Sequence, residues 1–249
     1  MKTAFVGLAC ASLFLAFSSC KTTPDNFSVE QVGEEYYPLE VGKYWIYEVD
    51  STIYDPTGDT MISFSKTLMK EEITDTILDY LGNVIYRFER YERKADTLPW
   101  NVSKVFTASI DGNLAIRTED NLRFIKMTFP LRVNNRWDGN LYFDNGLIVT
   151  VAGESVEMFK SWSYRVKALG VQDTVGGQSF GDVAVIQEAD AENQIELRRS
   201  FSTYAKGIGL IAREMWILDT QCIESCDGQT WEEKAEKGFI LHQTMLEHN

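Results

Sequence analysis

The sequence predicts an all-β protein with a curved antiparallel sheet, half-barrel or barrel-like in shape, of roughly ten to twelve strands. Three observations support this fold class. From Tyr36 onward, short alternating runs are rich in Val, Ile, Phe, Tyr, Trp and Thr, as in half-buried strands. Turn-forming residues separate these runs. Very little helix is expected, because only 230–237 has the Glu and Lys content of a helical turn or two.

The predicted strands follow one another along the chain. The first, 44–49, reads Tyr-Trp-Ile-Tyr-Glu-Val, and an Asp-Pro-Thr-Gly-Asp turn at 55–59 follows it, where Pro fixes φ and Gly accepts positive φ. The Asp-Gly-Asn at 111–113 and the Asp-Asn-Gly at 144–146 each predict a tight hairpin between two strands. The other predicted strands are 84–93, 102–110, 114–118, 122–129, 162–169, 183–188, 195–204, 210–218 and 239–246.

One pattern occurs twice. Residues 37–45 and 129–137 both read aromatic-Pro-Leu-x-Val-x-x-x-Trp. Gly42 and Asn134 occupy the same slot of this pattern, and both residue types tolerate a left-handed backbone. The repeat indicates either two related halves, with a break near 128–150, or one way of starting a strand that is used twice. A single pair does not separate these interpretations.

Residues 1–20 have the features of an export signal. Lys2 supplies a positive charge, and 4–17 is an apolar or small-residue run, shorter than the roughly 20 residues that cross a bilayer. Ser18 and Ser19 precede Cys20, so the segment resembles a lipoprotein signal, although Phe17 stands where Leu is usual. We predict a signal peptide over 1–19, a tether over 20–35 lipidated at Cys20 (palmitate), and a single β domain over 36–249. An ordinary secretory signal is the alternative.

Two cysteines remain for a disulfide. Cys10 leaves with the signal and Cys20 is acylated, so Cys222 and Cys226 are left, in a polar segment. In an oxidising compartment this C-x-x-x-C pair predicts a local disulfide. A zinc site would need further ligands, and His242 and His248 are the only imidazoles of the chain. We therefore expect no metal and no cofactor.

The charge of the chain disfavours some partners. The formal net charge is −13, whereas nucleic-acid phosphates require clustered Lys and Arg. The acidic pairs Glu34-Glu35, Glu71-Glu72 and Glu232-Glu233 would each place their carboxylates on opposite faces of a strand, so we expect a solvated surface there rather than an acid–base pair. The six Trp and eleven Tyr are expected mainly in the core, with a sugar platform or a lipid groove as the alternative.

The segment 177–181, Gly-Gln-Ser-Phe-Gly, matches the G-x-S-x-G nucleophile elbow, with Ser179 as its serine. His242 follows it, after the candidate acids Asp190 and Asp219, in hydrolase order. An elbow requires a helix after the serine, whereas the following Asp-Val-Ala-Val-Ile predicts a strand. We therefore expect no enzyme and no catalytic residue. A serine hydrolase that uses Ser179 and His242 is the alternative.

A further motif concerns modification. Five Asp-Ser or Asp-Thr pairs precede an aliphatic residue, Met or Thr, which resembles the O-glycosylation acceptor motif of Bacteroidetes-type periplasmic proteins. The same dipeptide is also common where a turn leads into a strand, so both interpretations stay open. The acceptors would be Ser51, Thr60, Thr76, Thr97 and Thr174.

Three stretches together carry a family resemblance. They are 36–47, 129–140 and 204–214, the last reading Tyr-x-x-Gly-x-Gly-Leu-x-x-x-Glu. They are similar to uncharacterised Bacteroidetes-type outer-membrane or periplasmic lipoproteins. A more distant similarity, of fold only, is to periplasmic lipoprotein carriers whose curved half-barrel holds acyl chains. The resemblance implies an envelope protein and no catalytic residues.

The resemblance also bears on location. In such lipoproteins surface export is associated with an acidic cluster directly after the acylated cysteine, and here the first acid is Asp25. We predict an outer-membrane, lipid-anchored protein on the periplasmic face, with the cell surface left open. Its predicted role is non-catalytic: it binds an apolar or glycan ligand, or it is structural. The membrane is the expected partner through the anchor, nucleic acid is not, and no protein partner is indicated.

Overall fold

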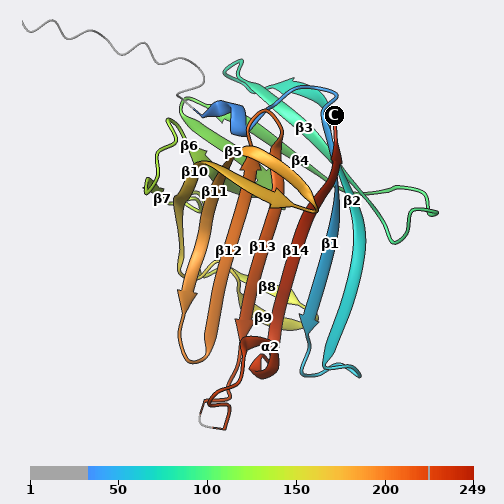
Figure 1. Ribbon diagram of the computed structural model, residues 1–249, viewed down its shortest axis with the longest axis vertical. Coiled ribbons are helices and arrows are strands. Elements are labelled where there is room, and N and C mark those ends of the chain that lie inside the picture. The colour runs from blue at the N-terminus through green and yellow to red at the C-terminus, as the bar shows by residue number, and fades with distance from the viewer. Residues whose placement is uncertain (1–32, 224) are drawn as a thin grey trace, which may run out of the picture.

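The computed structural model describes residues 33–223 and 225–249, so the predicted signal peptide and Cys20 lie outside the described residues. Twelve strands form one antiparallel sheet in the order β6-β5-β4-β3-β2-β1-β14-β13-β12-β11-β10-β7, and β8 pairs with β9 (Figure 1). The prediction of an all-β fold is confirmed. The strands are β1 (Tyr44–Tyr54), β2 (Ile62–Leu78), β3 (Val84–Arg93), β4 (Asn101–Asp111), β5 (Leu114–Glu119), β6 (Leu122–Thr128), β7 (Arg136–Trp137), β8 (Ile148–Val151), β9 (Glu154–Glu157), β10 (Trp162–Val175), β11 (Gln178–Glu192), β12 (Glu196–Ala205), β13 (Gly209–Asp219) and β14 (Lys237–His248). No helix of the described ranges is long and apolar enough to cross a membrane.

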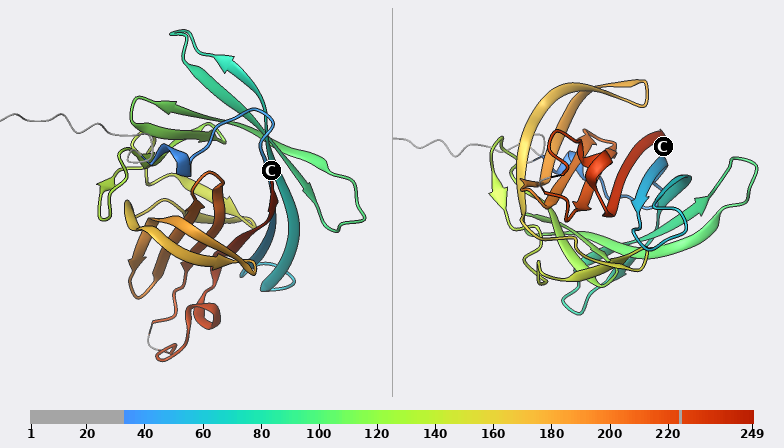
Figure 2. Two further views of the ribbon diagram at one scale, coloured as in Figure 1. Left: turned by 45° about the horizontal axis from the view of Figure 1, so that its top comes forward. Right: turned by 90° about the horizontal axis from the view of Figure 1, so that it is seen from below.

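Two meanders build the sheet, β1 to β6 and β10 to β14, and β14 pairs with β1 to join them. The sheet curls until its two ends approach each other (Figure 2). At the junction the Ile125 amide of β6 donates to the Gly139 carbonyl just beyond β7 at 2.8 Å, and Trp137 Nε1 donates to the Ile125 carbonyl at 2.8 Å. Curling protects the sheet edges and encloses the inward side chains. The fold is therefore a nearly closed barrel.

The two copies of the repeated pattern start β1 and β7 in the same way. Gly42 and Asn134 have φ values of 94° and 70°, so the predicted left-handed backbone is confirmed. The Gly42 amide donates to the Ile73 carbonyl of β2 at 2.8 Å, and the Asn134 amide donates to the Val166 carbonyl of β10 at 2.9 Å. Each copy thus fixes the beginning of a strand against a fully buried neighbour.

Two parts of the strand prediction are wrong. The prediction omits β2, which is the longest strand with 17 residues. Charged residues occupy both faces of β2 and hide the alternation of apolar and polar residues. The segment 144–146 does form a turn, in which the Gly146 amide donates to the Asp144 carboxylate at 2.8 Å. This turn leads into β8, but the residues before it form no strand, so it is not a hairpin.

The short helix α2 (Trp231–Lys234) lies where a helical turn is predicted. The Thr230 amide donates to the Glu233 carboxylate at 2.8 Å, which caps its first turn. Just before α2, Cys222 and Cys226 form the predicted disulfide, with their Cα atoms 5.7 Å apart. The helix covers a small apolar cluster on the outside of the barrel, made of Tyr54, Leu197, Leu218, Trp231 and Ile240.

Residues just before the first strand contact the barrel. Residues Glu34–Tyr36 form a 3-10 helix, η1. The Tyr36 hydroxyl, on a buried side chain, donates to the Asp182 carboxylate, and the Gly207 amide donates to the Glu35 carbonyl at 2.8 Å. The last residues assigned to the tether are therefore held against the barrel.

Candidate ligand-binding cavity

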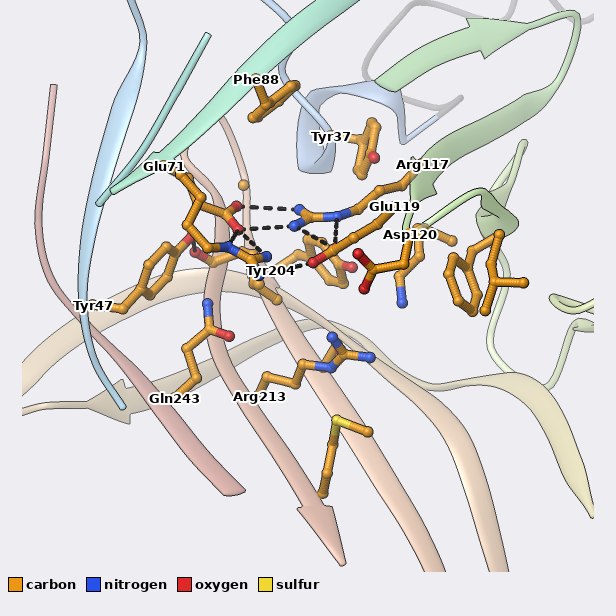
Figure 3. A pocket seen from close by; sticks show the side chains of 18 of the residues that line it. Tyr37, Tyr47, Glu71, Phe88, Arg117, Glu119, Asp120, Tyr204, Arg213 and Gln243 are labelled. Carbon is orange, nitrogen blue, oxygen red and sulfur yellow. Dashed lines mark hydrogen bonds and ion pairs between the residues drawn. The ribbon is translucent and has the colours of Figure 1, made fainter. Parts of the chain in front are cut away.

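The interior of the barrel contains a cavity of about 560 Å³, which is within the size range of small-molecule sites, about 300–1,000 Å³. Inward-facing residues of β1, β2, β3, β5, β6, β12, β13 and β14 line it, together with Tyr37 and the region around β8 (Figure 3). Alternation along each strand places these side chains inside. Most of the wall is apolar, and charged groups gather on part of it.

One set of charges, the glutamate–arginine cluster, consists of Glu71, Arg90, Arg117 and Glu119. Glu71 Oε1 lies 2.7 Å from Arg90 Nη2 and 2.8 Å from Arg117 Nη2. Glu119 Oε1 lies 2.8 Å from Arg90 Nη1, and its Oε2 accepts from Arg117 Nε at 2.9 Å. Two carboxylates thus neutralise two guanidinium groups. The cluster joins β2, β3 and β5, which are not all adjacent in the sheet.

Burial and pairing act in opposite directions on these carboxylates. Burial would raise the pKa of Glu71, but Arg117 and Arg90 outweigh it and hold this pKa below its ordinary value. The same balance lowers the pKa of Glu119. Glu71 is 3 % exposed, so the expectation of a solvated surface at Glu71-Glu72 is wrong for Glu71. That expectation assumed that water solvates the carboxylate. Here two arginines pair with the Glu71 carboxylate in place of water.

The second set of charges, the Glu188 cluster, consists of Glu188, Lys126, Arg213, Ser200 and Ser202. Glu188 on β11 is fully buried and pairs with Lys126 of β6 and with Arg213 Nη2 at 3.1 Å. The Ser200 and Ser202 hydroxyls donate to its carboxylate at 2.6 and 3.2 Å. Burial lowers the pKa of Lys126 to about 8, although Glu188 opposes this effect. The pKa of Glu188 is low, because Arg213 and Lys126 outweigh its burial.

The hydrolase alternative depends on Ser179 and His242, and the structure does not join them. Ser179 lies near the start of β11, beside the β10–β11 turn, where its hydroxyl is 3.2 Å from the Thr174 hydroxyl. His242 lies in the middle of β14, where its ring packs edge-on against Trp216 with centroids 6.2 Å apart. A strand follows Ser179, as predicted, and no hydrogen bond links it to a histidine among the described residues.

Four of the five predicted acceptors of O-glycans are exposed. Thr60 and Thr97 are exposed in loops, while Thr76 and Thr174 are exposed near strand ends. Ser51 is half-buried within β1. The Asp75 and Asp173 carboxylates accept from the amides of the following threonines at 2.7 Å, so the dipeptide has a structural role at these two sites. Modification stays a prediction.

Within residues 33–223 and 225–249, no group of three or more His, Cys, Asp or Glu side chains is arranged to hold a metal ion. The charged residues that line the cavity were not predicted from the sequence. Their signal was present: in 88–90 and 185–188 a charged residue stands at a position where alternation requires a core residue. These positions could have been predicted to face the interior of the barrel, which would then contain charged as well as apolar side chains.

No known protein-family model matches the chain, and no curated protein does so either. Two solved structures are similar to the chain at low identity. A "putative lipoprotein" from Parabacteroides distasonis ATCC 8503 is 10% identical and has a TM-score of 0.36, covering 86% of this chain and 98% of its own. A "putative exported protein with YmcC-like fold" from Bacteroides fragilis NCTC 9343 is 9% identical and has a TM-score of 0.38, covering 85% and 97%.

Proposed function

We propose that this protein binds a small ligand inside its barrel and does not convert it chemically. The observation that supports this role is the interior cavity of about 560 Å³, whose largely apolar wall carries a few converging polar groups. Such a combination is typical of small-molecule sites. Side chains that filled the interior would instead favour the structural role that the sequence also allows.

The proposed location is the periplasmic face of the outer membrane. Support comes from the export signal, from Cys20 as the acyl acceptor and from the lack of an acidic cluster directly after Cys20. The chain from Cys20 to Gly33, where the described barrel begins, spans at most roughly 45 Å when fully extended. An anchor at Cys20 would therefore keep the cavity close to the membrane.

Native mass spectrometry tests ligand binding directly. A chain that starts at Thr22 keeps every residue that the structure describes, and it would be expressed into an oxidising periplasm so that the Cys222–Cys226 disulfide forms. We expect a stoichiometric additional mass that is lost under denaturing conditions. A bare mass, lower only by the hydrogens lost in the disulfide, would contradict the proposal and favour a structural or partner-binding role.

A further inference from the structure

The two charged clusters inside the barrel differ in their balance. The glutamate–arginine cluster holds two cations and two carboxylates. A further carboxylate of the cavity wall, Asp120, is neutralised by Lys104, whose Nζ lies 2.6 Å from Asp120 Oδ2. The Glu188 cluster holds two cations, Lys126 and Arg213, and one carboxylate. With a pKa of about 8, lowered by burial, Lys126 is mainly protonated at neutral pH. The interior therefore carries an uncompensated positive charge in a chain whose net charge is −13, at a place where solvent screens weakly.

Arg213 has a buried hydrogen-bond donor without a partner among the described residues. A guanidinium has five N–H groups, and Arg213 donates from Nη2 to Glu188 at 3.1 Å. Its Nε is buried and has no partner among the described residues. Arg117, by contrast, donates from all three of its nitrogens to Glu71 and Glu119. Buried donors are normally paired. The unpaired Nε of Arg213 could therefore donate a hydrogen bond to an anionic ligand.

The surroundings of Arg213 form a polar place in the cavity wall. Arg213 pairs in register with Ser202 on one side and with Gln243 on the other, and all three residues line the cavity. Figure 3 shows the Arg213 and Gln243 side chains next to each other. Gln243 is 7 % exposed and brings an amide to the same place. A guanidinium beside an amide suits a carboxylate, which accepts hydrogen bonds through both oxygens.

Apolar residues line the cavity beyond this polar place. Met215 follows Arg213 on the inward face of β13, and Phe124 and Phe159 line the cavity as well. Leu147 and Ile148 also line it and are exposed, which places an opening beside β8. A ligand that fits this arrangement has one polar end and an apolar body.

We infer that the cavity binds a singly charged anionic amphiphile, an alkyl chain with a carboxylate, whose head lies on Arg213 and Gln243 and whose chain lies against the wall around Met215 and Phe159. This inference rests on the proposed ligand-binding function and names its ligand class. The single uncompensated charge sets the charge of the head, and the apolar wall with its opening sets the nature of the body.

The test uses displacement of the uncharged fluorescent probe N-phenyl-1-naphthylamine from the chain that starts at Thr22. Decanoate, decanol and decyltrimethylammonium compete with the probe below their micelle concentrations. They share one chain and differ in head charge. We expect decanoate to compete at roughly ten- to hundredfold lower concentration than decanol, because hydrogen bonds to a charged group are worth that ratio. Decyltrimethylammonium should be the weakest competitor.

Arg213→Met should remove the preference for decanoate over decanol. Arg199→Met is the matched control, because Arg199 pairs with Trp216 on the outward face of the neighbouring strand, and it should keep the preference. Equal competition by all three compounds in the unmodified chain would overturn the inference and leave ligand binding standing. Retention of the preference in Arg213→Met would overturn it as well. If none of the compounds competes and the probe itself does not bind, both the inference and the proposed function are wrong.

Discussion

The Glu188 carboxylate should be the most sensitive single charge in the barrel. It is fully buried and compensates Lys126 and Arg213 while it accepts from two serine hydroxyls. Glu188→Gln keeps the shape of the side chain but leaves both cations without a counter-charge. Breaking a buried pair in this way costs about 3–5 kcal/mol. Since whole domains are stable by about 5–15 kcal/mol, a large share of the free energy of unfolding should be lost.

Urea denaturation of the chain from Thr22 at neutral pH measures this loss. Asp111→Asn is the matched control, because it removes an exposed ion pair, 3.1 Å from Arg123 Nη2, and should cost about 0–1 kcal/mol. A loss for Glu188→Gln no larger than for this control would refute the assignment of Glu188 as the compensating charge. The double variant Glu188→Gln, Lys126→Met should lose less free energy of unfolding than the sum of the losses in the two single variants. The reason is that it removes one of the cations that Glu188→Gln leaves unpaired.

The pH dependence supplies a second check on the same residue. The pKa of Glu188 in the folded chain is lowered from 4.5 by Arg213 and Lys126, which outweigh its burial. A lowered carboxylate pKa stabilises the fold above the unfolded value, and this contribution is lost as the pH falls through the folded value. The difference in stability between the unmodified chain and Glu188→Gln should therefore shrink below pH 4.5. A difference that stays constant down to the acid transition would contradict this account.

Four further predictions follow from the sequence and the fold. Gly139→Ala should destabilise the barrel by about 1–3 kcal/mol or more, because a Cβ there would lie 2.3 Å from the Tyr164 ring at the junction of the sheet ends; unchanged urea unfolding would contradict this. Cys20→Ala should move the protein from the membrane fraction to the soluble periplasm, and retention in the membrane would refute the anchor. A fluorophosphonate probe should leave the protein unlabelled, whereas labelling that disappears in Ser179→Ala would establish the hydrolase alternative. The intact mass of native protein should exceed the peptide and lipid mass if the Asp-Ser and Asp-Thr sites carry glycans, and a mass without excess would remove that prediction.

The fold could be predicted where one face of a strand is apolar and the other is polar. β3 matches its predicted bounds at 84–93, because its turn signals and alternation agree. β2 was not predicted because ion pairs with other strands stabilise it. On one face Lys66 pairs with Glu48 of β1 at 2.8 Å. On the other face Glu71 is neutralised inside the barrel. Neither partner is close in sequence. Local patterning therefore fails where cross-strand charges replace apolar burial.

The site was less predictable than the fold for a related reason. Predicting it requires knowing that Lys126 and Glu188, 62 residues apart, face each other across an enclosed space. Sequence patterning gives the period of a strand but not the curvature of the sheet, and curvature decides which inward residues meet. The G-x-S-x-G segment shows that a short motif needs its structural context: the strand predicted after Ser179 is present, and the serine lies beside a strand turn next to Thr174.

The glutamate–arginine cluster connects strands that are not neighbours in the sheet. β2 and β5 are separated in the sheet by β3 and β4, and neighbouring strands lie about 4.8 Å apart, yet Arg117 of β5 contacts Glu71 of β2 at 2.8 Å. The side chains meet because the sheet curves strongly and both are long. The Arg117 guanidinium also lies 3.7 Å from the centroid of the Phe106 ring of β4, which fixes the intervening wall. A neutral, mutually satisfied cluster thus fixes one part of the wall, whereas the unbalanced Glu188 cluster leaves Arg213 available to a ligand.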